Sequence, residues 1–137
     1  MAVAHKTIGK LVDEAATLLQ RIVRMKAAVH AGSEFIQCVS CGKTGNWKEL
    51  QGGHFVPRGS AGTKLLEENI HPQCRQCNGP RGGNLIGYTV FMMDTYGPDF
   101  IRELHQMKRA GHKWVRADLV ELIAELKQRE KELEAQL

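Results

Sequence analysis

Four cysteines are the residues of this sequence whose spacing most clearly predicts a chemistry. They form two Cys-x-x-Cys pairs, Cys38 with Cys41 and Cys74 with Cys77, and the 137-residue sequence contains no other cysteine. Two such pairs supply the four thiolates of a tetrahedral zinc site. The alternatives are two independent redox motifs or buried free thiols, but the strand–helix–strand context of a thioredoxin-like motif is absent. The spacing therefore predicts one structural zinc ion.

A second polar set lies between the two pairs and directly after them. It consists of His54, Asn69, His71 and Asn78. An imidazole with a pKa near about 6.5 is suited to take a proton from water at neutral pH. An asparagine amide either fixes such a ring or offers its oxygen to a hard cation. These residue types are the parts of a site that hydrolyses a phosphodiester.

The same segment carries basic side chains that can contact phosphates, namely Arg58, Lys64, Arg75 and Arg81. Each candidate also has a structural interpretation. The basic side chains can be ordinary solvated charges, and the two histidines can be packing or hydrogen-bonding residues. Asn69 can be a turn residue, and Asn78 can cap the N-terminus of a helix.

The elements that must position these residues follow from the hydrophobic pattern. Residues 8–31 have an apolar residue every three or four positions, which predicts an amphipathic N-terminal helix. Residues 34–82 are rich in glycine and lose this periodicity, so this segment needs a metal to fold. Within it, short strands are expected around 53–57 and 68–71.

The C-terminal region is predicted to be helical over residues 84–137, with helices at 84–96, 98–110 and 115–136. In the last helix Leu119, Leu126 and Leu133 recur at every seventh position. This stripe either packs on its own chain or forms a dimer contact. The expected fold is a single α+β domain, in which long N- and C-terminal helices flank a small zinc-stabilised core.

Composition excludes several classes of protein. The chain is 42% hydrophobic and 25% charged, as in an ordinary soluble globular domain. No apolar run approaches the roughly 20 residues of a membrane span, and the first residues lack the apolar stretch of a secretory signal. We therefore expect no membrane partner and a cytoplasmic location. The net charge of +4 is a weak indication of a polyanionic partner.

In their order, the motifs resemble the HNH group of ββα-metal nucleases. The Cys-x-x-Cys-Asn ending is similar to that of endonuclease VII, a phage junction resolvase that also binds zinc through four cysteines. The resemblance implies an HNH-like core over residues 34–82. It implies that His54 is the general base and that Asn69 orients it. It also implies that Asn78 binds a catalytic Mg²⁺ or Mn²⁺.

A closer resemblance is to the NinG/Rap recombination proteins of lambdoid phages, and it covers roughly residues 8–90, with the dense motifs in 35–88. It rests on the motifs Phe-Ile-Gln-Cys-Val-Ser-Cys-Gly, Gly-His-Phe-Val-Pro-Arg-Gly, Asn-Ile-His-Pro-Gln-Cys-Arg-Gln-Cys-Asn and Gly-Asn-Leu-Ile-Gly-Tyr. Members of this family are described as endonucleases that act on branched DNA such as Holliday junctions and D-loops. The resemblance therefore implies a phage-encoded enzyme that acts on branched DNA in the cytoplasm of the host cell.

One departure from the HNH pattern leaves the expected metal site incomplete. Many HNH nucleases have an aspartate directly before the base, as a second metal ligand, whereas this sequence has Gly53. The second ligand must come from elsewhere, and the candidates are His71, Glu67 and Glu68. The missing carboxylate keeps an alternative function open, that of a zinc-stabilised DNA-binding protein that assists recombination without cutting.

A junction resolvase makes two symmetric cuts, and one site of this kind makes one. The expected active species is therefore a homodimer with two-fold symmetry. The helix at 8–30 and the final helix are the two elements that can form the contact. In the alternative, both helices fold back on their own chain and the protein acts as a monomer.

Overall fold

The computed structural model describes residues 6–57 and 59–137. The first element is the long helix α1 (Ile8–Ala31), which covers the range predicted from its apolar periodicity. The hydroxyl of Thr7 accepts a hydrogen bond from the backbone N–H of Lys10 and caps the first turn. Gly32 ends the helix in the left-handed conformation, with φ 63°, that favours glycine.

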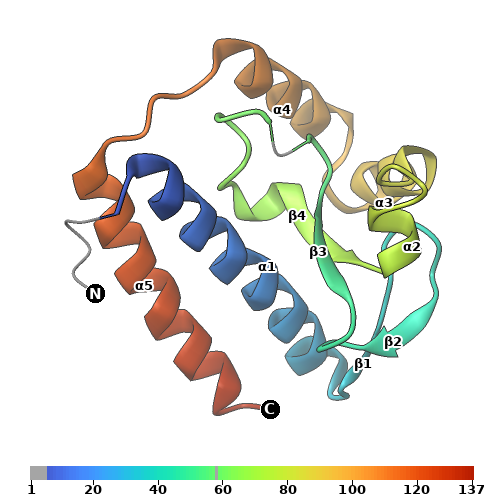
Figure 1. Cartoon of the computed structure of the whole chain (residues 1–137). Coiled ribbons are helices and arrows are strands. Elements are labelled where there is room, and N and C mark those ends of the chain that lie inside the picture. The colour runs from blue at the N-terminus through green and yellow to red at the C-terminus, as the bar shows by residue number, and fades with distance from the viewer. Residues whose placement is uncertain (1–5, 58) are drawn as a thin grey trace.

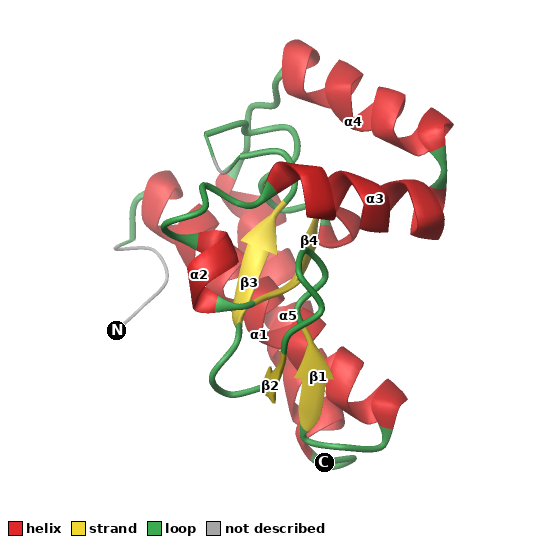
Figure 2. Ribbon diagram, turned by 90° about the vertical axis from the view of Figure 1, so that its right-hand side faces the viewer, coloured by secondary structure: helices red, strands yellow, loops and turns green. Residues whose placement is uncertain are grey.

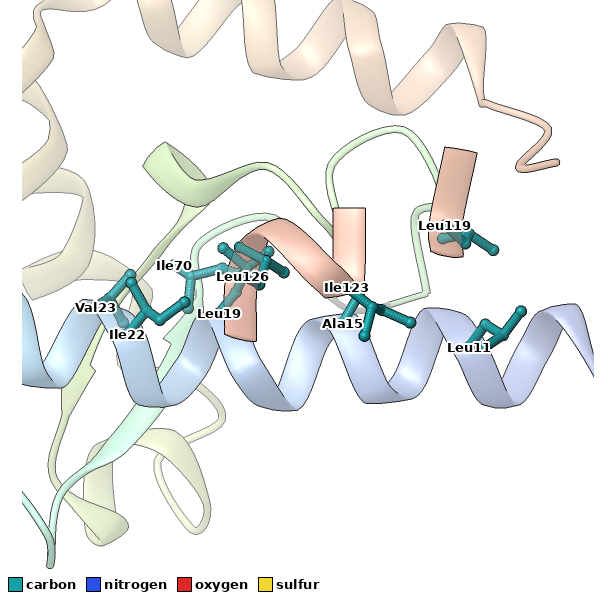
Figure 3. Packing of buried hydrophobic residues seen from close by; sticks show 9 residues of the cluster. All are labelled: Leu11, Ala15, Leu19, Ile22, Val23, Ile70, Leu119, Ile123 and Leu126. Atoms are coloured by element: carbon teal, nitrogen blue, oxygen red, sulfur yellow. The ribbon is translucent and has the colours of Figure 1, made fainter. Parts of the chain in front are cut away.

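Helix α5 (Arg116–Glu134) packs along α1 (Figure 1). Their facing side chains form the largest apolar cluster with one residue of a central strand (Figure 3): Leu11, Ala15, Leu19, Ile22, Val23, Ile70, Leu119, Ile123 and Leu126. Leu119 and Leu126 are buried there, and Leu133 packs at its edge. The leucine stripe therefore packs on its own chain, as the first of the two alternatives predicted.

The strands form two small antiparallel sheets. The first pairs β1 (Phe35–Gln37) with β2 (Thr44–Asn46), and the second pairs β3 (Gln51–His54) with β4 (Ile70–Gln73). Strand β3 begins two residues before the predicted range 53–57 and ends three residues before that range ends, and β4 lies two residues later than the predicted range 68–71. Gly52 allows β3 to approach α1 closely. A Cβ atom at this position would be 2.7 Å from the Cα of Gln20.

The second sheet is followed by short and long helices. The 3₁₀ turn η2 (Glu67–Asn69) lies directly before β4. After β4 come the helices α2 (Arg75–Asn78), α3 (Leu85–Tyr96) and α4 (Pro98–Ala110). Helices α3 and α4 lie on the side of the β3–β4 sheet away from α1 (Figures 1 and 2). There Tyr88, Met92 and Leu104 form a separate buried cluster with Val56.

The observed architecture confirms the predicted α+β class, with long helices flanking a glycine-rich segment that carries the strands. Strands β1 and β2 were not predicted, because three residues are too few to show an alternating pattern, and β2 has a glycine at its centre. Among the described residues, no helix is both long enough and apolar enough to cross a bilayer.

Candidate functional site

The four cysteines form one cluster, although the two pairs come from different parts of the chain. Their sulfur atoms all lie within 4.8 Å of one another, and the Sγ atoms of Cys41 and Cys74 are 3.8 Å apart. Four thiolates around a zinc ion at about 2.3 Å would be separated by about 3.8 Å. The cluster is therefore compatible with a structural zinc site, as the sequence predicted.

Local hydrogen bonds hold the two cysteine pairs in this arrangement. Gly42, with φ 80°, donates its N–H to the carbonyl of Cys38 at 2.8 Å and makes the tight turn of the first pair. In the second pair, the Sγ of Cys74 accepts the backbone N–H of Cys77 at 3.4 Å. The side-chain amide of Asn84 donates to the Sγ of Cys77 at 3.3 Å. Such donors stabilise thiolates and orient them toward a metal.

A cavity of about 580 Å³ lies between α1, β3 and the end of α2, where Asn78, the residue after Cys77, forms part of its wall. Both His54 and Asn78 line it, although they are far apart in the sequence. Gln20, Arg24 and Gln51 supply further polar groups to its wall. The described residues that line it include no carboxylate.

His54 ends strand β3 and is 8% exposed. Its Nε2 lies 2.9 Å from the backbone carbonyl oxygen of Lys64. A carbonyl can only accept a hydrogen bond, so this partner assigns the proton of the neutral ring to Nε2. Nδ1 then carries the lone pair. The neutral ring is therefore in the tautomer that has its lone pair on Nδ1, an atom that the surrounding protein covers.

Asn69 does not contact the His54 ring in the way that the sequence analysis expected. Its buried side chain accepts the backbone N–H of Val56 at 2.9 Å and donates to the carbonyls of Val56 and Thr63, at 3.1 and 3.2 Å. These bonds close the loop between β3 and η2, and Lys64 follows Thr63 in that loop. Asn69 therefore positions His54 indirectly, through the backbone that carries the Lys64 carbonyl.

Asn78 is the last residue of α2, and Cys74 is the N-cap of that helix, so the interpretation of Asn78 as an N-cap is wrong. The Asn78 amide nitrogen donates to the Oε1 of Gln51 at 2.8 Å. Its own Oδ1 lies 3.0 Å from where a Cβ atom of Gly53 would be. The side-chain oxygen is thus oriented toward the end of β3.

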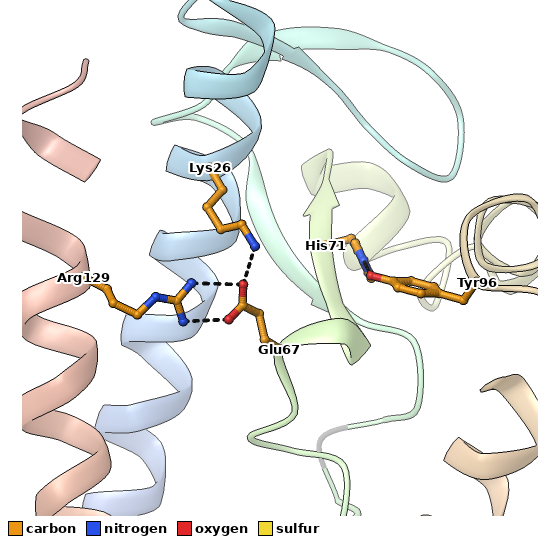
Figure 4. Close-up of polar contacts among 5 residues, drawn as sticks. All are labelled: Lys26, Glu67, His71, Tyr96 and Arg129. Carbon is orange, nitrogen blue, oxygen red and sulfur yellow. Dashed lines mark hydrogen bonds and ion pairs between the residues drawn. The ribbon is translucent and has the colours of Figure 1, made fainter. Parts of the chain in front are cut away.

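The structure does not bring His71 to this cavity. Its two ring nitrogens are hydrogen-bonded to the hydroxyls of Tyr88 and Tyr96, at 3.1 and 2.9 Å (Figure 4 shows the second). Burial lowers the pKa of His71 to about 4, so the ring is neutral. It lines a second, larger cavity between α1, β4 and α3. The structural interpretation of His71 is the one that fits, and the metal-ligand interpretation is not supported.

The two candidate glutamates also line the second cavity rather than the first. Glu67 accepts hydrogen bonds from Arg129 of α5 and Lys26 of α1, at 2.7 and 2.6 Å (Figure 4). The Arg129 hydrogen bond, together with Lys26, lowers the pKa of Glu67 to about 2. Glu67 therefore ties η2 to both long helices and is not a ligand at the His54 cavity.

The predicted phosphate contacts differ in their surroundings. The ammonium group of Lys64 pairs with Asp13 of α1 at 2.9 Å and is mostly covered. Arg75 and Arg81 are exposed on and after α2, with Nη1 of Arg81 3.6 Å from the Sγ of Cys77. Arg58 lies outside the described residues.

Arg24 brings a positive charge to the wall of the cavity and was not among the residues predicted from the sequence. Its Nη1 donates to the carbonyls of Trp47 and Leu50, at 3.2 and 2.8 Å. Burial, and to a lesser extent nearby Arg21, lowers the pKa of Arg24. The only signal in the sequence is that Gln20 and Arg24, one helical turn apart, form a polar row beside the apolar stripe of α1.

Comparison with known proteins places this sequence in a family. The family model described as "Bacteriophage Lambda NinG protein" matches residues 2–136. The chain is 30% identical over 117 residues to protein ninG of Salmonella phage P22, covering 80% of this chain and 57% of the relative. The identity to protein ninG of Escherichia phage lambda is also 30% over 117 residues, covering 80% of this chain and 56% of the relative.

The chain thus spans a little over half the length of these curated relatives. No solved structure matches it. Because the family model extends over nearly the whole sequence, the chain belongs to the NinG family of lambdoid phage proteins.

Proposed function

We propose that this chain is a metal-dependent endonuclease with an HNH-like core that cuts branched DNA intermediates of recombination. The observation that carries the proposal is the meeting of His54 and Asn78 in one cavity, beside the cysteine cluster. Supporting it, β3, β4 and α2 follow one another as strand, strand and helix, with His54 at the end of the first strand and Asn78 at the end of the helix. We place this activity in the cytoplasm of the infected host cell.

In the proposed reaction, Nδ1 of His54 takes a proton from a water molecule while the water oxygen forms a bond to phosphorus. The bond between phosphorus and the leaving oxygen breaks, and that oxygen takes up a proton from solvent. The backbone carbonyl of Lys64 holds the neutral ring in the required tautomer before the transfer and still accepts from Nε2 in the imidazolium that forms. Mg²⁺ or Mn²⁺ held by Asn78 would supply positive charge for the leaving oxygen. Arg24, Arg75 and Arg81 provide positive charge for the flanking phosphates.

The experiment is a nicking assay on a labelled four-way junction with Mg²⁺ or Mn²⁺. We expect cleavage by the zinc-loaded parent. His54→Ala should reduce turnover by about 10²–10⁴-fold, the usual contribution of a positioned base. Junction binding should survive, because phosphate contacts dominate affinity. The matched control is His105→Ala, which removes an exposed histidine of α4 and should cut like the parent.

A second function, that of a DNA-binding accessory protein without catalysis, is favoured by the absence of a carboxylate among the described residues that line the cavity. Junction binding by the parent without cleavage under either metal would select this function. Equal cleavage by the parent and the His54→Ala variant would show that His54 is not the base.

We also propose that the active species is a homodimer, because two symmetric cuts need two sites. The faces of α1 and α5 that were expected to form the contact cover each other within one chain, so a different surface must join the two copies. Sedimentation equilibrium of the protein, free and bound to a junction, tests this. A monomer in both states, with cutting first order in protein, would exclude the dimer.

A further inference from the structure

Gln73, at the end of β4, has a fully buried polar side chain. Hydrogen bonds fix the nitrogen of its amide group but not the oxygen. Its Nε2 donates to the hydroxyl of Ser40 and to the carbonyl of Gly83, both at 2.7 Å. Because a carbonyl can only accept, the nitrogen must face Gly83, and Oε1 must point the other way. No donor among the described residues reaches Oε1. A buried amide oxygen without a donor is unfavourable unless a ligand completes it.

The Oε1 of Gln73 points at the place where the sequence lacks its expected aspartate. A Cβ atom built on Gly53 would lie 1.7 Å from Oε1 of Gln73 and 3.0 Å from Oδ1 of Asn78. The two amide oxygens are therefore separated by no more than the sum of these distances. Gly53 of β3 is paired with His71 of β4, so both residues lie on the same face of the sheet. Gln73 is two residues after His71 and therefore also lies on that face.

Two converging amide oxygens without a donor between them suit a cation. Hard divalent ions such as Mg²⁺, Mn²⁺ and Ca²⁺ accept carbonyl-type oxygens as ligands. The glycine is what makes room, because any side chain at position 53 would collide with Gln73. Gln73 itself is buried and does not line the cavity, but Asn78 and Gly83, which lie next to it, do.

We propose that Gln73 replaces the missing carboxylate and binds the divalent cation together with Asn78. The binding of the cation by these two residues is independent of the proposed function, and only its part in cleavage rests on that function. Both ligands are neutral, so the free protein should hold the ion weakly, and phosphate oxygens of bound DNA should complete its coordination. The site thus differs from one with an aspartate in needing its substrate for tight metal binding.

The test measures Mn²⁺ binding to the intact, zinc-loaded protein by the electron paramagnetic resonance signal of free Mn²⁺. Gln73→Leu should raise the dissociation constant at least about tenfold, and Gln73→Glu should lower it, because an ionised carboxylate binds a hard cation more tightly. Gln76→Leu, which changes an exposed glutamine of α2, is the matched control and should bind like the parent. Unchanged Mn²⁺ binding by Gln73→Leu would overturn the proposal.

A second measurement needs no variant and so does not depend on whether Gln73→Leu folds. Substoichiometric Mn²⁺ should broaden the amide resonances of Gly53, Gln73 and Asn78 before others. Broadening centred on other residues would also overturn the proposal.

If Mn²⁺ binds at Gln73 but the protein cuts no DNA, the cation site is supported and the endonuclease function is contradicted. If the protein cuts DNA and its Mn²⁺ binding does not depend on Gln73, the endonuclease function is supported and the cation site is contradicted.

Discussion

At the scale of single residues, backbone carbonyls and buried amides determine what the side chains of the cavity can do. The Lys64 carbonyl selects the tautomer of His54, and Asn69 holds the loop that carries this carbonyl. Neither of these two contacts involves a charged side chain, so a neutral backbone group selects the tautomer of the proposed base.

The indirect role of Asn69 predicts a specific pattern of defects. Asn69→Ala removes three buried hydrogen bonds to the loop backbone, which should cost about 1–3 kcal/mol of unfolding free energy. Limited proteolysis should cut the loop between β3 and η2 faster, and turnover on a junction should fall. A loss of turnover with unchanged protection of the loop would instead indicate a direct contact between Asn69 and the ring.

Glu67 predicts how stability depends on pH. Its pKa is lowered from 4.5 to about 2, so the unfolded chain takes up its proton first as the pH falls. The stabilisation is complete above pH 4.5 and is lost as the pH falls through about 2. Glu67→Gln should therefore lower the unfolding free energy by roughly 1–2 kcal/mol at pH 7 and by much less near pH 2.

Urea denaturation of the parent and the Glu67→Gln variant across this pH range checks the prediction. The control is Glu49→Gln, which alters an exposed glutamate. Comparing each variant with the parent at the same pH removes the contribution of the cysteine cluster, which all three proteins share. A difference between parent and Glu67→Gln that does not change with pH would show that the ion pairs are not its cause.

At the scale of elements, the helices could be predicted and the positions of functional groups largely could not. Helix α1 and the stripe of Leu119 and Leu126 follow from periodicity, which is a local property of the chain. The pairing of the cysteines follows from their spacing. Gln73 has no local signal, and Arg24 has only its place in the polar row of α1, because each acts through contacts that only the folded chain creates.

The packing of α5 on α1 makes a direct prediction. Leu126 is 2% exposed between the two helices, and Leu126→Ala should cost about 2–5 kcal/mol because it leaves a cavity. Val120→Ala, which truncates a residue of α5 that is 38% exposed, should cost much less. Urea denaturation at several protein concentrations measures both. A loss that depends on concentration would mean that Leu126 contributes to a dimer instead.

At the scale of the whole molecule, the cysteine cluster joins parts that the sequence keeps apart. It shares an apolar cluster with Met25 of α1 and with Trp47, which follows β2. The β1–β2 hairpin is too small to bury much surface alone. Zinc would therefore hold this hairpin, α2 and the end of α1 together, while the α1–α5 cluster has its own apolar packing.

Removing zinc should consequently unfold one part of the molecule before the other. A chelator should expose Trp47, now 5% exposed, and shift its fluorescence to longer wavelength. The Trp114→Phe variant leaves Trp47 as the only tryptophan and isolates this signal. Much of the helical circular dichroism should remain. Simultaneous loss of both signals would show one cooperative unit, and no change on complete metal removal would exclude a structural zinc.

The contact between α1 and α5 also determines when the chain can fold. The apolar face of α1 is made early in synthesis, but most of its partner residues belong to α5, which follows all the other elements. Contacts between such distant segments form slowly, because a long loop must close first. The nascent chain therefore carries an uncovered apolar helix while the cysteine-rich segment is being made, and a chain that stops after α4 would expose the face that α5 covers.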